Sequence, residues 1–262
     1  MVVDFINVGL LIMLSINQTL LFSIISWCRL FFSSTFILLF SVLSFSSDVL
    51  SAPTSPIVSS SLVIADFATE KLENWQSKSF VGETEYTIVN EDDKTVLKAY
   101  SQNSASALAK EITIDLLKTP FFNWSWKIEN GLPNLDEITK DGDDYAARLY
   151  LVKSGGWKIW NTRALNYVWS SNQQAGSIWN NAFVGDNAKM LSVKGKEDTV
   201  SVWATEKRNV YKDLILIFGD KGSEKDNQEA YRYLDAVAIM TDTDNSQLNA
   251  TAYYSNIYFS AN

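Results

Sequence analysis

Short runs in which apolar and polar residues alternate recur from Leu62 to the end of the chain. Alternation with a period of two is typical of β-strands that bury one face. The connections between the runs are short and rich in Gly, Asn, Asp and Ser, which favour tight turns. We therefore predict strands within the ranges 62–67, 85–89, 95–100, 106–116, 120–129, 144–152, 157–170, 189–193, 199–205, 234–240 and 250–259.

One segment departs from this pattern and predicts a helix. Over residues 208–218, apolar side chains recur at helical spacing, from Val210 to Leu214 and on to Ile217 and Phe218, and Gly219 then provides a stop. About ten short strands, one short helix and no repeat predict a mainly β fold, an antiparallel two-sheet sandwich of jelly-roll type. A closed barrel fits the same pattern, and the sequence does not separate the two.

The strand predicted at 144–152 follows an acidic turn and has two different faces. Alternation directs one set of side chains to a core face and a second set to the opposite face; the sets are Tyr145, Ala147, Leu149 and Leu151, and Asp144, Ala146, Arg148 and Tyr150. The second face therefore offers a carboxylate, a guanidinium and a phenol, which together suit a polar ligand. An ordinary Asp144–Arg148 pair on a solvated sheet face fits the same residues.

The first 52 residues have a different composition from the rest of the chain. They carry only three charges, at Asp4, Arg29 and Asp48. Arg29, the apolar run 30–45 and the small residues before Pro53 follow the order of a secretory signal peptide. The run 5–27 is also long enough to span a bilayer, so an uncleaved anchor is the alternative. Residues 53–61 have linker composition, and 62–262 are predicted to form a single β-sandwich domain.

Charge and residue types exclude several classes of function. The chain has a net charge of −8, and no basic run stands out, which argues against a nucleic-acid partner. It contains no histidine, and its one cysteine, Cys28, lies in the apolar N-terminal segment. The domain therefore lacks the usual general base, the usual zinc ligands and any thiol nucleophile. Any chemistry must use carboxylates, Tyr, Lys, Ser or a hard cation.

Acidic turns supply the candidate metal and catalytic residues. The turn at 242–245 resembles the opening of a calcium loop, with Asp242, Asp244 and Asn245 as candidate ligands, but it lacks the glycine and the distant glutamate of that motif. Turn formation alone explains these residues equally well. For a carboxylate-based enzyme, the candidate acid/base residues are Asp144 with Asp242 or Asp244, since two carboxyl groups can flank a glycosidic bond. The acids Asp143 and Glu206 are also available.

Aromatic residues supply candidate contacts to a sugar. The chain has nine tryptophans, and exposed aromatic rings stack against the flat apolar faces of sugars. Trp124, Trp126 and Trp203 are assigned to the core. Trp157, Trp160 and Trp179 lie beside Gly, Asn and Ser and are predicted to bind ligand from loops, together with Asp144, Arg148, Tyr150 and Asn166 on the sheet.

From about Leu62 onward, the chain resembles a bacterial family known only as domain of unknown function number 3047. The matching blocks are FFNWSWKIENGLP at 121–133, GDDYAARLYLV at 142–152, ALNYVWSS at 164–171, RNVYKDLILIFG at 208–219, VAIMTDTDNS at 237–246 and AYYSNIYF at 252–259. The resemblance implies an exported bacterial protein. It implies no activity and no catalytic residues, because none is established for the family.

Two functions fit these residues. The first is an exported binding module, periplasmic or secreted, that holds a polysaccharide or a cell-envelope glycan on one sheet face. The second is a glycoside hydrolase or polysaccharide lyase on the same fold, with Arg148 positioning the substrate; a structural cell-envelope protein is a further alternative. Neither needs a cofactor, calcium excepted, and contact with a membrane is expected only through an uncleaved N-terminal segment.

The signal-peptide interpretation makes a direct prediction about the mature protein. Because Arg29 precedes an apolar run that ends at small residues, cleavage near Ala52 should leave an N-terminus at about Pro53. N-terminal sequencing of protein recovered outside the cytoplasm measures this. An intact 1–52 segment recovered with the membrane fraction would show an anchor instead.

Overall fold

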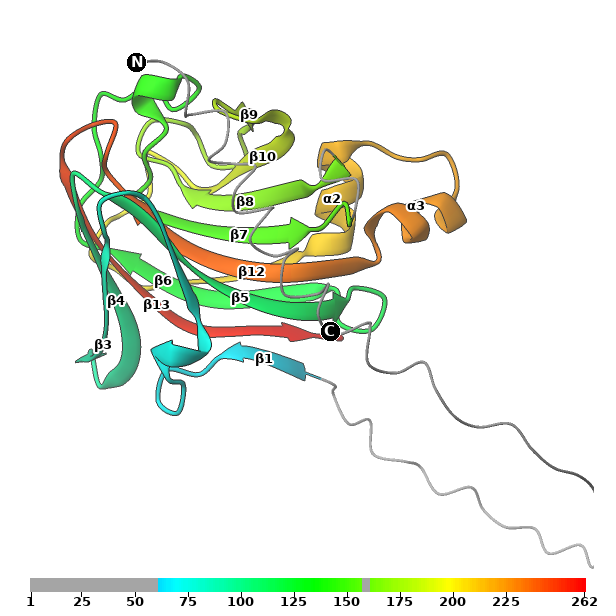
Figure 1. Cartoon of the computed structure of the whole chain (residues 1–262), viewed down its shortest axis with the longest axis horizontal. Helices are drawn as coiled ribbons and strands as arrows, with labels where there is room; N and C mark the ends of the chain where they lie inside the picture. Colours follow the sequence, from blue (N-terminus) through cyan, green and yellow to red (C-terminus); the bar gives the residue numbers. More distant parts are fainter. Residues whose placement is uncertain (1–60, 157–160) are drawn as a thin grey trace, which may run out of the picture.

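In the computed structural model, which describes residues 61–156 and 161–262, two β-sheets face each other across one hydrophobic core (Figure 1). The six-stranded sheet has the order β11-β6-β13-β4-β3, with β1 paired to β13. Its strands are β1 (Ser61–Ala65), β3 (Glu85–Glu91), β4 (Lys94–Gln102), β6 (Phe121–Ile128), β11 (Ala204–Asn209) and β13 (Asn249–Ser260). The predicted export segment, most of the linker, Trp157 and Trp160 lie outside the described residues.

The second sheet has seven strands in the order β2-β5-β12-β7-β8-β10-β9. Its strands are β2 (Gln76–Val81), β5 (Ala105–Asp115), β7 (Ala147–Lys153), β8 (Arg163–Trp169), β9 (Ile178–Asn181), β10 (Gly185–Lys194) and β12 (Tyr233–Asp242). All strand pairs in the two sheets are antiparallel except β8 with β10, which is parallel. The predicted antiparallel sandwich is thus confirmed, and the closed barrel is not what forms.

The core between the sheets is aromatic. Trp124 of β6 stacks on Tyr167 of β8 with ring centroids 5.2 Å apart, and Trp126 packs against Trp169 at 5.7 Å. Phe122 of β6 joins this contact, as the alternation in residues 120–129 predicts. These strands direct their large aromatic side chains into the space between the two sheets. The outer face of each sheet therefore carries different residues.

Within the described residues two α-helices, rather than one, lie at the end of the sandwich where β7 finishes and β8 and β12 begin (Figure 1). Helix α2 (Val210–Phe218) is the predicted one, and it begins where the side chain of Asn209 accepts a hydrogen bond from the Lys212 amide. Helix α3 (Glu224–Tyr231) was not predicted, because its sequence is polar on most sides. Within the described residues, no helix is long and apolar enough to cross a membrane.

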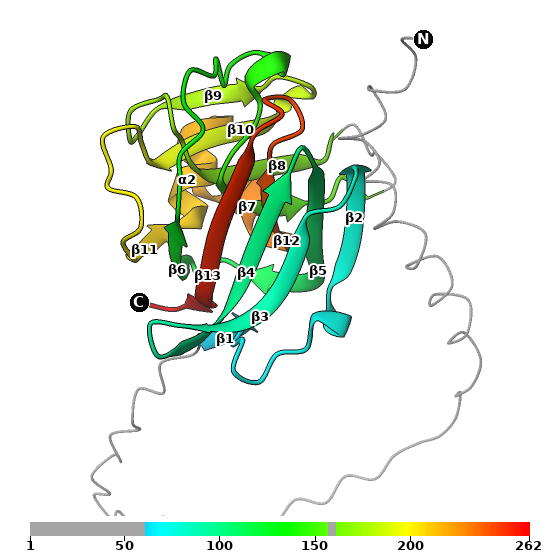
Figure 2. The same ribbon diagram turned by 90° about the vertical axis from the view of Figure 1, so that its left-hand side faces the viewer.

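The opposite end of the sandwich holds the connections that matter for function. Figure 2 looks onto this end, where the turn from β12 to β13 lies. The segment before β7 contains a short 3₁₀ turn, Lys140–Gly142; a second one, Leu72–Asn74, precedes β2. Gly142 is required there, because a Cβ at this position would collide with the backbone of Asp136. This tight fold of residues 136–142 directs Asp143 and Asp144 toward the end of β12.

Candidate functional site

The start of β7 and the end of β12 meet because the two strands are antiparallel neighbours. Arg148 is the register partner of Met240, so the chain beyond Met240 runs beside the chain that precedes Arg148. Asp242 donates its backbone N–H to the carbonyl of Tyr145 over 3.2 Å, and the Tyr145 N–H donates to Asp242 Oδ1 over 3.3 Å. Residues about one hundred positions apart in the sequence thus share one corner of the sheet.

Arg148 is at the centre of this corner, on the face of the seven-stranded sheet that points away from the inter-sheet core. Its Nη2 donates to Asp242 Oδ2, and its Nη1 lies 3.7 Å from Asp143 Oδ2. The side chains of Arg148 and Asp242 are only 3% and 2% exposed. The prediction that Arg148 pairs with Asp144 is wrong, because the residues before Ala147 leave the extended path. The ion pair is therefore a buried one between β7 and β12.

Two tyrosine rings hold the guanidinium from the sides. The Cζ atom of Arg148 lies 4.7 Å from the ring centre of Tyr145 and 5.0 Å from that of Tyr150, which suits cation–π attraction. Tyr145 is fixed in turn by Trp179, whose Nε1 donates to its hydroxyl over 3.3 Å. The guanidinium therefore has little freedom to move.

Asp144 performs a different task from the one predicted. Its carboxylate accepts hydrogen bonds from the backbone N–H groups of Asn245 and Ser246, at 3.3 and 2.6 Å, and from the side-chain amide of Asn245 at 3.2 Å. It is fully buried. Asp144 thus holds the turn between β12 and β13 in place, as short acidic side chains commonly do for backbone turns.

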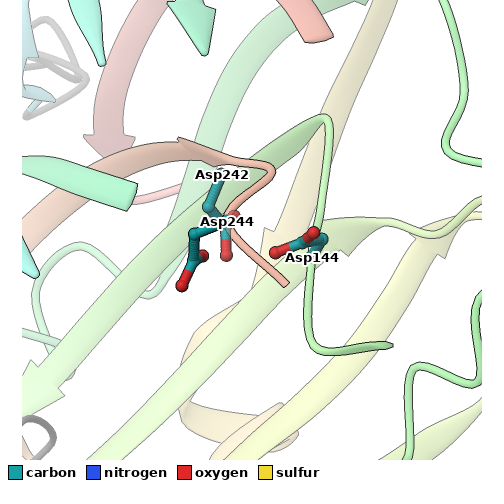
Figure 3. A group of neighbouring side chains, drawn as sticks. All are labelled: Asp144, Asp242 and Asp244. Atoms are coloured by element: carbon teal, nitrogen blue, oxygen red, sulfur yellow. The ribbon is translucent and has the colours of Figure 1, made fainter. Parts of the chain in front are cut away.

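Three carboxylates gather beside the guanidinium. Oxygens of Asp144, Asp242 and Asp244 all lie within 4.8 Å of one another. Figure 3 shows Asp144, from the segment before β7, pointing toward Asp242 and Asp244, from the end of β12 and the turn after it. The cluster adjoins the buried ion pair, because Asp242 belongs to both.

Burial in this corner disfavours the negatively charged form of the carboxyl groups. It raises the pKa of Asp242 well above the usual value, although the Arg148 guanidinium opposes this shift, and it raises the pKa of Asp143 with the same opposition. Burial and the neighbouring Asp144 carboxylate raise the pKa of Asp244 to about 6. Burial alone would lower the pKa of Arg148, but the Asp242 carboxylate raises it, so the guanidinium keeps its charge.

Next to Arg148, on the same face, two polar atoms stand out. Asn166 of β8, the register partner of Tyr150, donates its Nδ2 to the Lys189 carbonyl over 3.2 Å. Its Oδ1 is buried and has no hydrogen-bond partner within the described part of the chain, and the same is true of Arg148 Nε. The buried apolar side chains packed against Tyr150 are Ala105, Ala107, Val152, Ala164, Ala188, Ala236 and Met240, most of which are small.

The remaining predicted site residues have varied placements. Trp179 lies on strand β9 and is largely buried, so its predicted placement in a loop is wrong, and its contact with a ligand stays a prediction. Tyr145 faces Arg148 and Ala146 lies in the main core, the reverse of the predicted faces. Trp203 is half-buried on the outer side of the six-stranded sheet and donates its Nε1 to Asp92, so it is not a core residue. Glu206 pairs with Lys194 elsewhere, at 3.5 Å.

Sequence reasoning gave too little weight to Asp143 and missed Asn181. Asn181 donates its Nδ2 to Asp143 Oδ2 over 3.0 Å, while Asp143 Oδ1 is buried with no partner among the described groups. Asp143 was available as an acid in the same turn as Asp144. The distance of 3.7 Å between Arg148 Nη1 and Asp143 Oδ2 shows that Asp143, and not Asp144, turns to Arg148.

Calcium at Asp242, Asp244 and Asn245 stays a prediction, with Asp144 now a neighbouring oxygen donor. If calcium binds the native state, the melting temperature should rise with added calcium by mass action. Asp244→Asn, alone or with Asp242→Asn, should abolish this rise. Glu229→Gln on exposed α3 removes the same charge and should retain it. A melting curve indifferent to calcium and to chelator would leave the cluster as a turn and an ion pair.

The burial of Arg148 predicts a large stability effect. Arg148→Ala leaves Asp242 as an uncompensated buried carboxylate, so unfolding free energy should fall by on the order of 3 kcal/mol or more. On an exposed sheet face the same change would cost at most about 1 kcal/mol. Arg148→Lys should lie between, because lysine retains the charge but not the planar fork. Urea denaturation measures all three proteins.

Arg232→Ala is the matched control, since Arg232 also pairs with an aspartate, Asp115 at 2.8 Å, but its side chain is 38% exposed. It should lose much less stability than Arg148→Ala. Equal losses in the two alanine variants would contradict the buried-pair account.

The sequence matches the model of one protein family over residues 73–258, described as Protein of unknown function (DUF3047). No curated protein matches the chain. Among solved structures, it is similar to a mutant of the family 29 carbohydrate-binding module CBM29-2, at 9% identity and a TM-score of 0.35, over 78% of this chain and 86% of that one.

It is also similar to the module TmCBM61, solved with β-1,4-galactotriose, at 10% identity and a TM-score of 0.34, over 74% of this chain and 92% of that one. A third similar structure is the enzymatically active domain of the bacteriophage CBA120 tailspike protein 4, at 11% identity and a TM-score of 0.38, over 76% of this chain and 21% of that one. The family match covers most of the domain, and the chain therefore belongs to the DUF3047 family of proteins of unknown function.

Proposed function

We propose that the protein binds a carbohydrate on the outer face of the seven-stranded sheet, around Arg148, Tyr150 and Asn166. The observation that carries this proposal is the pair of buried polar atoms, Arg148 Nε and Asn166 Oδ1, that have no hydrogen-bond partner within the described residues. Buried polar groups in native proteins are almost always paired, and an unpaired one costs about 1–3 kcal/mol. Two such atoms on one face favour a ligand that completes them.

The two atoms differ in their chemistry in a way that suits a sugar. Arg148 Nε is a donor and Asn166 Oδ1 is an acceptor. A hydroxyl group can both accept from the first and donate to the second, and adjacent hydroxyls are what a sugar ring presents. Tyr150, the half-buried residue between them, adds an aromatic surface against which the apolar face of a ring can pack.

The site is also held in one geometry before any ligand arrives. Asp242 and the two tyrosine rings fix Arg148, and the Lys189 carbonyl orients the amide of Asn166. Side chains that are already ordered lose little entropy on binding, so more of the contact energy contributes to affinity. With export as predicted from the sequence, the ligand is a polysaccharide met outside the cytoplasm, such as a cell-envelope glycan.

The convergence of the three carboxylates favours a second candidate, a glycoside hydrolase or lyase. A carboxyl group such as Asp244, with its pKa raised to about 6, resembles a general acid. Its two partners fit less well, because Asp144 already accepts three hydrogen bonds and Asp242 is neutralised by Arg148. The expected outcome is binding without the release of new reducing ends or unsaturated products.

Affinity electrophoresis against a panel of soluble polysaccharides tests the binding proposal. Asn166→Ala removes the unpaired acceptor and should weaken binding about tenfold, the loss expected for one hydrogen bond. Tyr150→Ala should weaken it by at least as much. Trp203→Ala, on the outer face of the other sheet, is the control and should bind like the wild type.

The opposite pattern would contradict the proposal. If Trp203→Ala loses binding while Asn166→Ala and Tyr150→Ala bind like the wild type, the ligand binds on the six-stranded sheet. If the wild-type protein binds none of the polysaccharides, carbohydrate binding is excluded.

A further inference from the structure

The charged side chains around the site limit which carbohydrates it can bind. One guanidinium, Arg148, lies beside Asp143 and Asp242, and oxygens of Asp144 and Asp244 lie within 4.8 Å of Asp242. Asp242 and Asp143 face the two Nη atoms of the guanidinium, so a ligand anion could not pair with this fork in the bidentate manner and would find only Nε. Acidic groups thus outnumber the one cation in a region shielded from water, where charges interact strongly.

The buried atoms of this site that have no hydrogen-bond partner in the described part of the chain show the same preference. Two are acceptors, Asn166 Oδ1 and Asp143 Oδ1, and one is a donor, Arg148 Nε. A ligand that completes all three must donate two hydrogen bonds and accept one. Neighbouring hydroxyl groups do this, whereas a carboxylate group can only accept.

We infer that the site selects neutral polysaccharides through adjacent hydroxyl groups and that the surrounding aspartates exclude uronic-acid polymers. This inference rests on the proposed carbohydrate binding at the same face. Oxygens of Asp144, Asp242 and Asp244 lie within 4.8 Å of one another, and Asp143, Asp144 and Asp242 are buried. A uronate carboxylate placed beside them would lose its hydration and be repelled by their charge.

Asp244 is the member of the cluster best placed to act on a ligand. It is half-buried, whereas Asp143, Asp144 and Asp242 are buried. Its carboxylate therefore lies nearest to solvent, where an approaching anion would first be repelled. Asp244→Asn removes this charge while retaining the shape of the side chain, so it separates repulsion from fit.

The test compares one polymer in two charge states. The neutral polysaccharide that the protein retains in the panel is oxidised at its C6 hydroxyls to the uronate, and both forms are cast in native gels that contain EDTA, so that no divalent cation bridges the acids. Wild-type protein should bind the oxidised polymer at least roughly tenfold more weakly, as expected for like charges within a few ångströms of each other. Asp244→Asn should regain several-fold of this loss.

Glu229→Gln is the matched control, because it changes the net charge equally on exposed α3, far from the cluster in the fold. It should regain nothing, which excludes general repulsion between an acidic protein and an acidic gel. Equal or tighter binding of the oxidised polymer by the wild type would overturn the inference and leave carbohydrate binding intact. A loss that Asp244→Asn does not relieve would also overturn it, because a missing C6 hydroxyl would then explain the loss. Retention of neither form would overturn the proposed function itself.

Discussion

The guanidinium of Arg148 and the carboxylate of Asp242 are removed from water on the outer face of the seven-stranded sheet. Each ion loses several kcal/mol of hydration on burial, and only close pairing with good geometry offsets that loss. Two neighbouring strands supply the two ions: Arg148 comes from β7 and Asp242 from β12. The antiparallel register of these two strands therefore determines whether the corner can exist.

Several other features follow from holding this pair in place. The tyrosine rings at positions 145 and 150 surround the guanidinium, and Trp179 on β9 fixes the first of them. Asp144 secures the turn that carries Asp244, and Gly142 permits the sharp path that presents Asp143. The inter-sheet core on the other side of β7 is aromatic and aliphatic, so the sheet is a rigid support. The face that we assign to ligand binding is thus built from the two strands at the centre of the sheet and their neighbours.

An element could be predicted from the sequence when its own residues followed a clear pattern. Strands such as β5, β6, β12 and β13 alternate clearly, and the helix α2 has an apolar stripe with an asparagine cap and a glycine stop. Helix α3, EKDNQEAY, lacks such a stripe and was missed. Arg148 and Tyr150 were identified from the two faces of one predicted strand, and the structure places Asn166 of β8 as the register partner of Tyr150. The partner of Arg148 was not identified correctly. It depends on the register between two strands and on the start of extended structure at Ala147, and the residue pattern of a single strand contains neither.

The Nε–H of Arg148 is the atom on which the account depends most directly, and ¹H–¹⁵N NMR observes it. Arg148→Lys identifies its signal among those of the arginines. The account predicts a resolved, slowly exchanging signal in the free protein, because the atom is buried. Titration with an oligosaccharide of the retained polysaccharide should shift that signal together with the side-chain amide of Asn166, in step with binding. Saturation of the protein with neither signal moved would show that the ligand binds elsewhere, and the central claim would be wrong.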